Sequence, residues 1–158
     1  MRRRIALTCS LVALLVAAAV IAGTGCGSKK FTTSTSQGTS VSVFLLKGDG
    51  VFVKVSRPAS KTGAETALQE LLKGPSASDK QQDLSTAIPD GVKLLSYSAA
   101  NGAAKVDLSK ELKNHGDGSA TVQAIVNQIN NTVMSNDSTV KSVAITVGGV
   151  PSDEALKP

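Results

Sequence analysis

The stretch Thr62-Gly-Ala-Glu-Thr-Ala-Leu-Gln-Glu-Leu-Leu-Lys-Gly-Pro75 predicts a helix that is apolar on one side. Thr62 and Glu65 have the spacing of a capping box, in which each side chain satisfies a backbone N–H group of the other residue. Gly74 and Pro75 end the helix, because glycine adopts the left-handed C′ conformation and proline cannot continue the helix. A helix with one apolar stripe has to cover a sheet or another helix. The stripe consists of Ala64, Ala67, Leu68, Leu71 and Leu72.

A second amphipathic helix is predicted to begin near Ser119 and to end at Asn136-Asp137. One face is aliphatic, with residues recurring at helical spacing. The other face carries glutamine and asparagine, which are neutral and form hydrogen bonds. This helix therefore also needs a sheet against its apolar stripe, which consists of Val122, Ile125, Val126, Ile129 and Val133.

Five strands are predicted around these helices. Residues 41–46 and 51–56 read as a hairpin closed by the turn at 47–50, and residues 92–98 and 103–108 as another. Asn101-Gly102 fits a type I′ turn, since both residues tolerate positive φ. Residues 143–147 alternate as in a half-buried strand. Residues 76–91 and 109–118 read as polar connections, the latter with a helical turn near Leu112.

These elements predict an α+β fold with the order β-β-α-β-β-α-β. The hairpins make the sheet mixed and largely antiparallel, and both helices are expected on one of its faces. The ordered domain is predicted to span residues 41–150. The tail at 151–158 is expected to be loose.

The first 25 residues have the three zones of a signal peptide. Arg2, Arg3 and Arg4 form a cationic start, residues 5–22 are almost wholly apolar, and Gly23-Thr-Gly25 precedes Cys26. This arrangement resembles a bacterial lipobox, in which the cysteine thiol is acylated and becomes the new N-terminus. Gly23 stands where an aliphatic residue is typical, so ordinary secretion and an uncleaved anchor are the alternatives. The Ser/Thr-rich residues 26–40 are expected to form a flexible tether.

Removal of the signal peptide changes both the charge and the cysteine content of the chain. The net charge falls from +5 to +2 with the three arginines, so basicity does not indicate a nucleic-acid partner. Cys9 is lost with the leader and Cys26 is acylated. The expected mature domain therefore has no disulfide and no thiol chemistry.

No residue set predicts catalysis, a metal site or a cofactor. His115 is the single histidine, and His115 with Asp117 falls short of the three or four ligands that a metal needs. A hydrolase needs a nucleophile, a base and an orienting group, and His115 is the sole candidate base. Gly48-Asp49-Gly50 lacks the helix and lysine of a phosphate loop and reads as a turn.

The candidate partner-binding residues are Arg57 and part of the second helix. Arg57 ends a strand and is the only arginine outside the leader. A solvated charge, a structural ion pair and a partner contact are all open for it. The amide side chains of the helix can donate and accept hydrogen bonds without desolvating a charge. They are Gln123, Asn127, Gln128 and Asn131.

Several segments of the chain resemble the GerMN domain, a sporulation and germination module. Ala67-Leu-Gln-Glu-Leu-Leu-Lys-Gly-Pro75 is similar to its "ALeeLlkGP" segment, and Ser85-Thr-Ala-Ile-Pro-Asp-Gly91 to its "saiP.gt" segment. Val106-Asp-Leu-Ser109 resembles "vdlS", and Arg57 matches a basic position. Residues 126–133 and 140–149 are similar to the second helix and the closing strand. The resemblance covers most of residues 41–149.

This resemblance implies an extracytoplasmic interaction module without enzymatic activity. Such domains are frequent in lipoproteins of Gram-positive and actinobacterial type, and some act in sporulation or cell-envelope complexes. The chain is therefore expected on the outer face of the cytoplasmic membrane. It would hold an envelope protein partner, or a second copy of itself, as an adaptor. A sensor for a small ligand or an envelope polymer is the alternative.

Overall fold

The computed structural model describes residues 38–48, 50–116 and 118–157. The predicted signal peptide, Cys26 and nearly all of the tether lie outside these residues, as do Asp49 and Asp117. Within them, no helix is both long and apolar enough to cross a bilayer.

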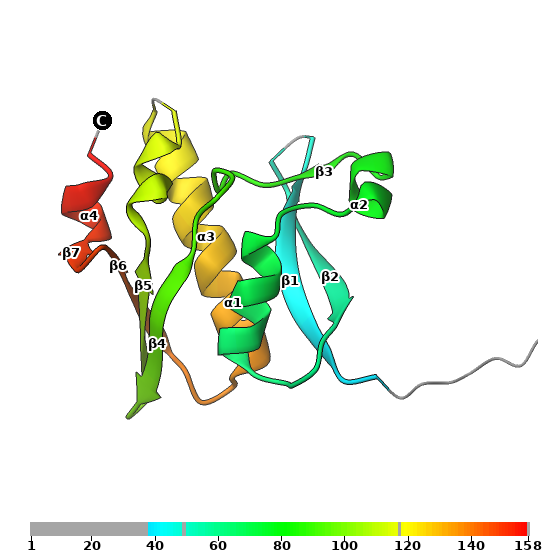
Figure 1. Ribbon diagram of the computed structural model, residues 1–158, viewed down its shortest axis with the longest axis horizontal. Helices are drawn as coiled ribbons and strands as arrows, with labels where there is room; N and C mark the ends of the chain where they lie inside the picture. The colour runs from blue at the N-terminus through cyan, green and yellow to red at the C-terminus, as the bar shows by residue number, and fades with distance from the viewer. Residues whose placement is uncertain (1–37, 49, 117, 158) are drawn as a thin grey trace, which may run out of the picture. The chain divides into compact units, whose positions relative to one another are not determined.

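Two sheets and two long helices make up the domain (Figure 1). The first sheet has the order β2-β1-β3 and the second the order β4-β5-β6-β7. The strands are β1 (Ser40–Lys47), β2 (Phe52–Pro58), β3 (Leu84–Ser85), β4 (Leu94–Ala100), β5 (Ala103–Leu108), β6 (Ser142–Val147) and β7 (Val150–Pro151). The helices are α1 (Ala64–Leu72), α2 (Ala77–Gln81), the 3-10 turn η1 (Lys110–Asn114), α3 (Ser119–Asn136) and α4 (Ser152–Ala155).

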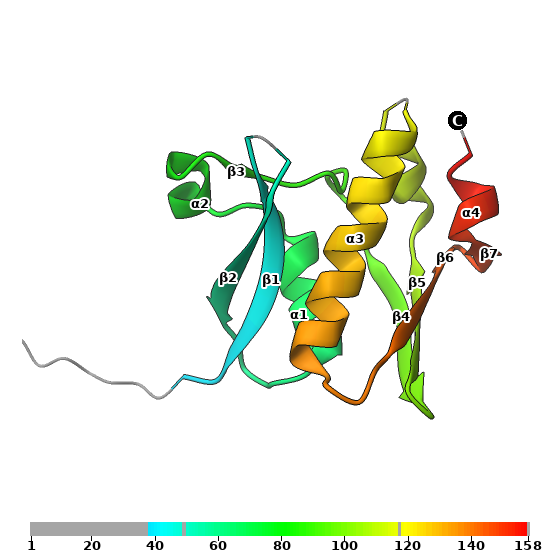
Figure 2. The same cartoon turned by 180° about the vertical axis from the view of Figure 1, so that it is seen from behind.

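The predicted fold class is confirmed, with the strands divided between two sheets. All strand pairs are antiparallel except β5 with β6. The helices α1 and α3 lie between the sheets rather than on one face of a single sheet (Figures 1 and 2). They pack against each other and against β1 on one side, and against β4 and β6 on the other.

An aliphatic core fills the space between the sheets and the helices. The strands β1 and β5 contribute alternate residues to it, since successive side chains of a strand point to opposite faces. From β1 these are Val41, Val43 and Leu45, and from β5 they are Ala104, Val106 and Leu108. Leu68 and Leu71 of α1 and Ile125, Ile129 and Val133 of α3 meet them.

Several local predictions are confirmed by the backbone. Asn101 and Gly102 have φ values of 52° and 79° and close the β4–β5 hairpin. Gly74 has a φ of 75° and follows Lys73, the C-cap of α1, as the helix-ending interpretation requires. The helical turn near Leu112 is η1, and α3 spans the predicted residues.

The capping box predicted at Thr62 is wrong. The helix α1 begins at Ala64 after Gly63, which has a φ of 116° and provides no side-chain cap. Glu65 is therefore the second helical residue, one position too early for the box. A capping box does form at Ser76 and Asp79, where α2 begins. This short helix and β3 lie in the stretch predicted to be an irregular connection.

The expectation of a loose tail is also wrong. Residues Val150–Pro151 pair with β6, and Ser152–Ala155 form α4. Leu156 is only 2% exposed and belongs to the core. A single aliphatic residue among polar neighbours gives no periodic signal, so the tail could not be recognised as part of the domain.

Candidate functional site

Gln128, one of the four predicted surface amides, is fully buried and therefore cannot lie on a binding surface. Its Nε2 donates to the carbonyl oxygen of Phe44 at 2.8 Å. Its Oε1 accepts from the N–H of Ala87 at 2.8 Å and from the hydroxyl of Thr86 at 3.2 Å. The side chain thus joins α3 to β1 and to the segment after β3.

Two further side chains of α3 continue this contact along β1. The hydroxyl of Thr132 accepts from the N–H of Phe44 at 3.2 Å. Asn136 bonds both backbone groups of Ser42, with its Nδ2 2.6 Å from the carbonyl and its Oδ1 2.9 Å from the N–H. Gln128, Thr132 and Asn136 are spaced four residues apart, so they form one row on the helix.

This row takes the place of a neighbouring strand. β1 pairs with β2 on one edge, whereas β3 covers only Leu46 and Lys47 on the other. The backbone of Ser42 and Phe44 would otherwise be an unpaired edge beside the core, which is costly. Part of the neutral face of α3 is therefore structural. The spacing of residues 128, 132 and 136 was the only sign of this row in the sequence. To interpret that spacing, one must know which strand lies beside the helix.

The other three predicted amides remain on the outside of α3. Gln123 is exposed, and Asn127 and Asn131 are half-buried. Gln123 Nε2 donates to Asn127 Oδ1 at 3.0 Å, along the helix. The side chain of Asn131 has no hydrogen-bond partner in the described part of the chain. Met134, 40% exposed, is three residues from Asn131 on the same helix. These four residues are named the outer α3 surface below.

Arg57 forms a structural ion pair. Its guanidinium contacts the carboxylate of Asp79 and lies 3.4 Å from the carbonyl oxygen of Gly74. Both side chains are largely buried, with 15% and 5% exposed. Asp79 also accepts from the backbone and hydroxyl of Ser76 at 2.7 and 2.6 Å. One cluster thus ties the end of β2 to the loop after α1 and to α2.

The environment of Asp79 lowers its pKa. Burial, the largest single influence, raises it, but the hydrogen bonds from Ser76 and the charge of Arg57 together outweigh burial. Asp79 is thus held as an anion. Sequence reasoning left the ion pair of Arg57 open and missed Asp79 as its partner, since the two residues come from distant elements.

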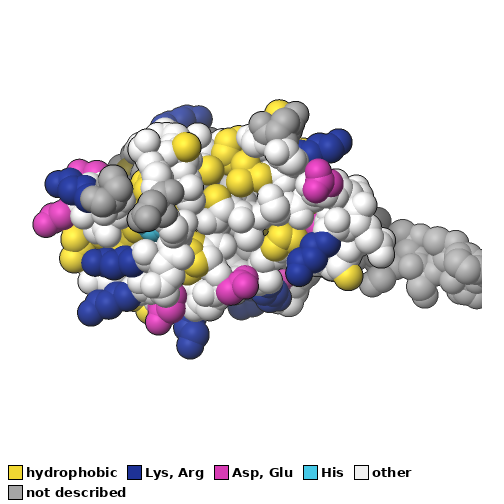
Figure 3. All heavy atoms as spheres, turned by 90° about the horizontal axis from the view of Figure 1, so that it is seen from above, with side chains coloured by type: hydrophobic (Ala, Val, Ile, Leu, Met, Phe, Trp, Pro, Cys, Tyr) yellow, Lys and Arg dark blue, Asp and Glu magenta, His cyan; other side chains and the backbone are white. Residues whose placement is uncertain are grey.

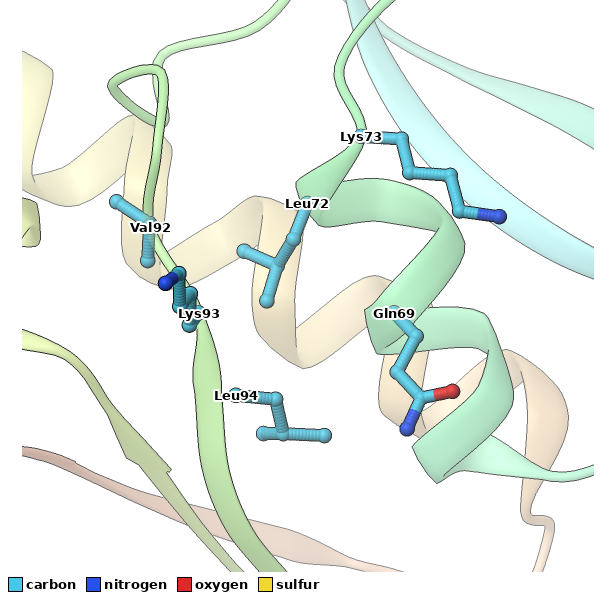
Figure 4. Close-up of a pocket in the computed structure, with 6 residues that line it drawn as sticks. All are labelled: Gln69, Leu72, Lys73, Val92, Lys93 and Leu94. Carbon is cyan, nitrogen blue, oxygen red and sulfur yellow. The ribbon is translucent and has the colours of Figure 1, made fainter.

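A hollow of about 260 Å³ opens between α1 and the start of β4 (Figure 4). Gln69, Leu72 and Lys73 line it from α1, and Val92, Lys93 and Leu94 from the other side. The side chains of Leu72 and Leu94 point into the space between helix and strand, whereas Lys73 points away from it (Figure 4). Lys73 instead pairs with Glu70 at 2.5 Å.

His115 lines a second hollow, of about 370 Å³, with Thr86, Ile88, Asp90 and Asn114. Its Nδ1 is buried without a partner among the described residues. Those residues hold no group of three or more His, Cys, Asp or Glu side chains suited to a metal ion. Lysine and acidic side chains are interspersed on the face seen in Figure 3, without a patch of one sign.

The fold and these surfaces define a small α+β domain with an aliphatic core and shallow hollows. A family model described as sporulation and spore germination matches residues 42–153. The chain therefore belongs to this family, the Germane family of GerMN domains, as the sequence segments predicted.

Solved structures share the fold. The first GerMN domain of the sporulation protein GerM from Bacillus subtilis matches with a TM-score of 0.57 and 20% identity, over 72% of this chain and 85% of that one. The tandem GerMN domains of the same protein match equally well, over 40% of that chain. At this identity the likeness shows the fold alone. No curated protein sequence matches the chain.

Proposed function

We propose that this chain is a lipid-anchored adaptor outside the cytoplasmic membrane. Acylation of Cys26 fixes it to the outer face of that membrane, and the residues after it let the GerMN domain reach a protein of a cell-envelope or sporulation-related complex. The three-zone leader and the membership of the sporulation family support this role. Binding, rather than catalysis, is the activity proposed.

The observation that carries the proposal is the division of the polar side chains on α3 into two rows. The side chains of Gln128, Thr132 and Asn136 are all hydrogen-bonded to the backbone of β1. Among the described residues, the only side-chain hydrogen bond of the outer α3 surface is the one between Gln123 and Asn127. Amides with one exposed methionine offer hydrogen bonds and apolar area without a charge to desolvate.

Cross-linking in intact cells tests this function with the full chain. The variant Gln123→Ala/Asn127→Ala/Asn131→Ala should fold and reach the membrane, but lose the cross-linked species that the wild type forms. Gln81→Ala removes an exposed amide from α2 and should retain that species. Cys26→Ala should release the protein from the membrane and also lose the species. A triple variant that cross-links like the wild type would refute the role of the outer α3 surface.

The hollow beside His115 favours one alternative, a sensor for a small ligand or an envelope polymer. Its lining is mainly polar and includes an unpaired imidazole nitrogen. Soluble envelope glycan fragments titrated into the full chain should then shift the NMR signals of His115 and Asn114. Signals that stay unchanged at millimolar fragment would remove this alternative.

A further inference from the structure

The outer face of the second sheet carries a polar hollow of about 390 Å³. In β5, the side chains of Ala104, Val106 and Leu108 lie in the core. Those of Lys105 and Asp107 therefore point to the opposite face, since successive side chains of a strand alternate. Both line the hollow, which thus lies on the side of the sheet that faces away from the core. It is separate from the two surfaces considered above.

The strand register arranges the lining of this hollow in two rows across three strands. Neighbouring strands are about 5 Å apart, and residues two positions apart in one strand are about 7 Å apart. Apart from the lysine, no side chain in either row is longer than aspartate, so the hollow stays open above the sheet. The first row is Ser96, Asp107 and Thr146, and the second is Ser98, Lys105 and Ala144.

The carboxylate of Asp107 is held in one orientation at this hollow. Its Oδ1 accepts from the hydroxyl of Thr146 at 2.6 Å and from the N–H of Gly149 at 2.9 Å. The bond from Thr146, followed by that from Gly149, lowers the pKa of Asp107 against the opposing effect of burial, so the group is an anion at neutral pH. Its Oδ2 has no partner among the described residues. A fixed acceptor of this kind binds a donor with little cost of reorganisation.

Lys105 brings a positive charge to the same face. It is exposed, and within the described residues no ion pair includes it, so it does not neutralise Asp107. The hydroxyls of Ser96 and Ser98 also have no hydrogen-bond partner there. A simple anion would meet the charge of Asp107, and a simple cation would meet that of Lys105. A ligand that carries both charges complements the two together.

We propose that this hollow binds a free α-amino acid. The ammonium group of the ligand donates to Oδ2 of Asp107, and its carboxylate accepts from Nζ of Lys105. The hydroxyl of Ser98, in the same row as Lys105, donates to the second carboxylate oxygen. Ala144 has no group beyond Cβ and leaves room for the side chain of the ligand. This binding is independent of the adaptor role, so either can fail alone.

Titration of the full chain in detergent micelles with glycine, the smallest α-amino acid, tests the inference. Glycine should shift the backbone amide NMR signals of Asp107, Ala144 and Gly149 to saturation. The expected dissociation constant is about 1–10 mM, since exposed charge contacts contribute little. N-acetylglycine lacks the ammonium charge and glycinamide lacks the carboxylate, so each should bind about tenfold more weakly or worse.

Two variants assign the charges. Asp107→Asn keeps an acceptor for Thr146 and Gly149 but removes the negative charge, and Lys105→Gln removes the positive one. Each should weaken glycine binding about tenfold. Lys54→Gln is the matched control, because Lys54 is an exposed lysine of a strand in the first sheet, and it should bind glycine like the wild type.

The dispersion of the amide signals shows whether each variant is folded. Lys105 makes no hydrogen bond or ion pair within the described residues, so Lys105→Gln keeps the test valid even if Asp107→Asn disturbs its turn. The inference is overturned if glycine causes no saturable shift at about 50 mM, well above the expected dissociation constant. It is also overturned if either blocked form binds as tightly as glycine, or if Lys105→Gln binds glycine like the wild type.

Discussion

The strands β1 and β4 meet their helices in opposite ways. β1 has one edge on β2 and the other on the side chains of α3, so the backbone of Ser42 and Phe44 is satisfied on both sides. β4 has one edge on β5, and within the described residues no strand pairs with the other. A helix can thus close a strand edge when its amides reach the backbone.

Breaking the closed edge should have the largest effect. Gln128→Leu retains the size of the side chain but leaves the carbonyl of Phe44 and the N–H of Ala87 unpaired in the interior. Each buried group left unpaired costs about 1–3 kcal/mol, so we expect a loss of about 3–5 kcal/mol in the free energy of unfolding. Urea denaturation followed by circular dichroism measures it.

The control for this change is Gln123→Leu, which makes the same substitution at an exposed site of the same helix. Its stability should stay within about 0.5 kcal/mol of the wild type. Equal losses in the two variants would show that the amide row does not hold β1.

The ion pair at the end of β2 should have the next effect. Arg57→Ala leaves the largely buried carboxylate of Asp79 without its cation, and we expect a loss of about 2–4 kcal/mol at neutral pH. Lys54→Ala removes an exposed charge from the same strand and should change stability by less than about 0.5 kcal/mol. Thermal unfolding of the two variants separates these cases.

The pH dependence of stability tests the same cluster. Because the folded state lowers the pKa of Asp79, its contribution is present above the unfolded pKa of about 4 and is lost as the pH falls through the lower folded value. The stability difference between wild type and Asp79→Asn should therefore shrink in acid. A difference that is constant from pH 7 to pH 2 would contradict the assignment.

A change in β4, at Tyr97, should stabilise the domain. Burial, followed by the charges of Asp137 and Glu65, raises the pKa of Tyr97, and its hydroxyl is buried without a partner among the described residues. Tyr97→Phe should therefore add about 1 kcal/mol to the free energy of unfolding. Relative to this variant, the wild type should lose stability as the pH rises above about 10. A destabilised Tyr97→Phe domain would show that the hydroxyl has a partner.

The smallest effect is expected for the exposed residues Leu95 and Val51. Leu95→Lys and Val51→Lys should each change the free energy of unfolding by less than about 0.5 kcal/mol, because both side chains are mostly in water. Chemical denaturation of the two variants checks this. A larger loss for Leu95→Lys would mean that the side chain of Leu95 makes contacts that stabilise the fold.

The sequence predicted most long elements because their signals are local. The period of α3, the Asn101-Gly102 turn and the stop at Gly74-Pro75 each depend on neighbouring residues. The short helices α2 and α4 were not predicted. They are held in place by contacts between distant residues, namely the ion pair of Asp79 with Arg57 and the burial of Leu156 in the core. Of the candidate site, three amides stayed on the surface, whereas Gln128 and Arg57 are structural.

The sequence by itself determined the α+β class, the order of the main elements and the resemblance to the family that the family model confirms. Hydrophobic periodicity and turn residues are local signals, so they can be recognised without knowing which other element packs against them. Only the tertiary structure decided that the strands form two sheets around α1 and α3, and which polar residues of α3 face a strand. Those facts depend on contacts such as Gln128 with Phe44, between residues far apart in sequence. The periodicity of a helix shows on which side of the helix a residue lies, but it does not show which element packs against that side.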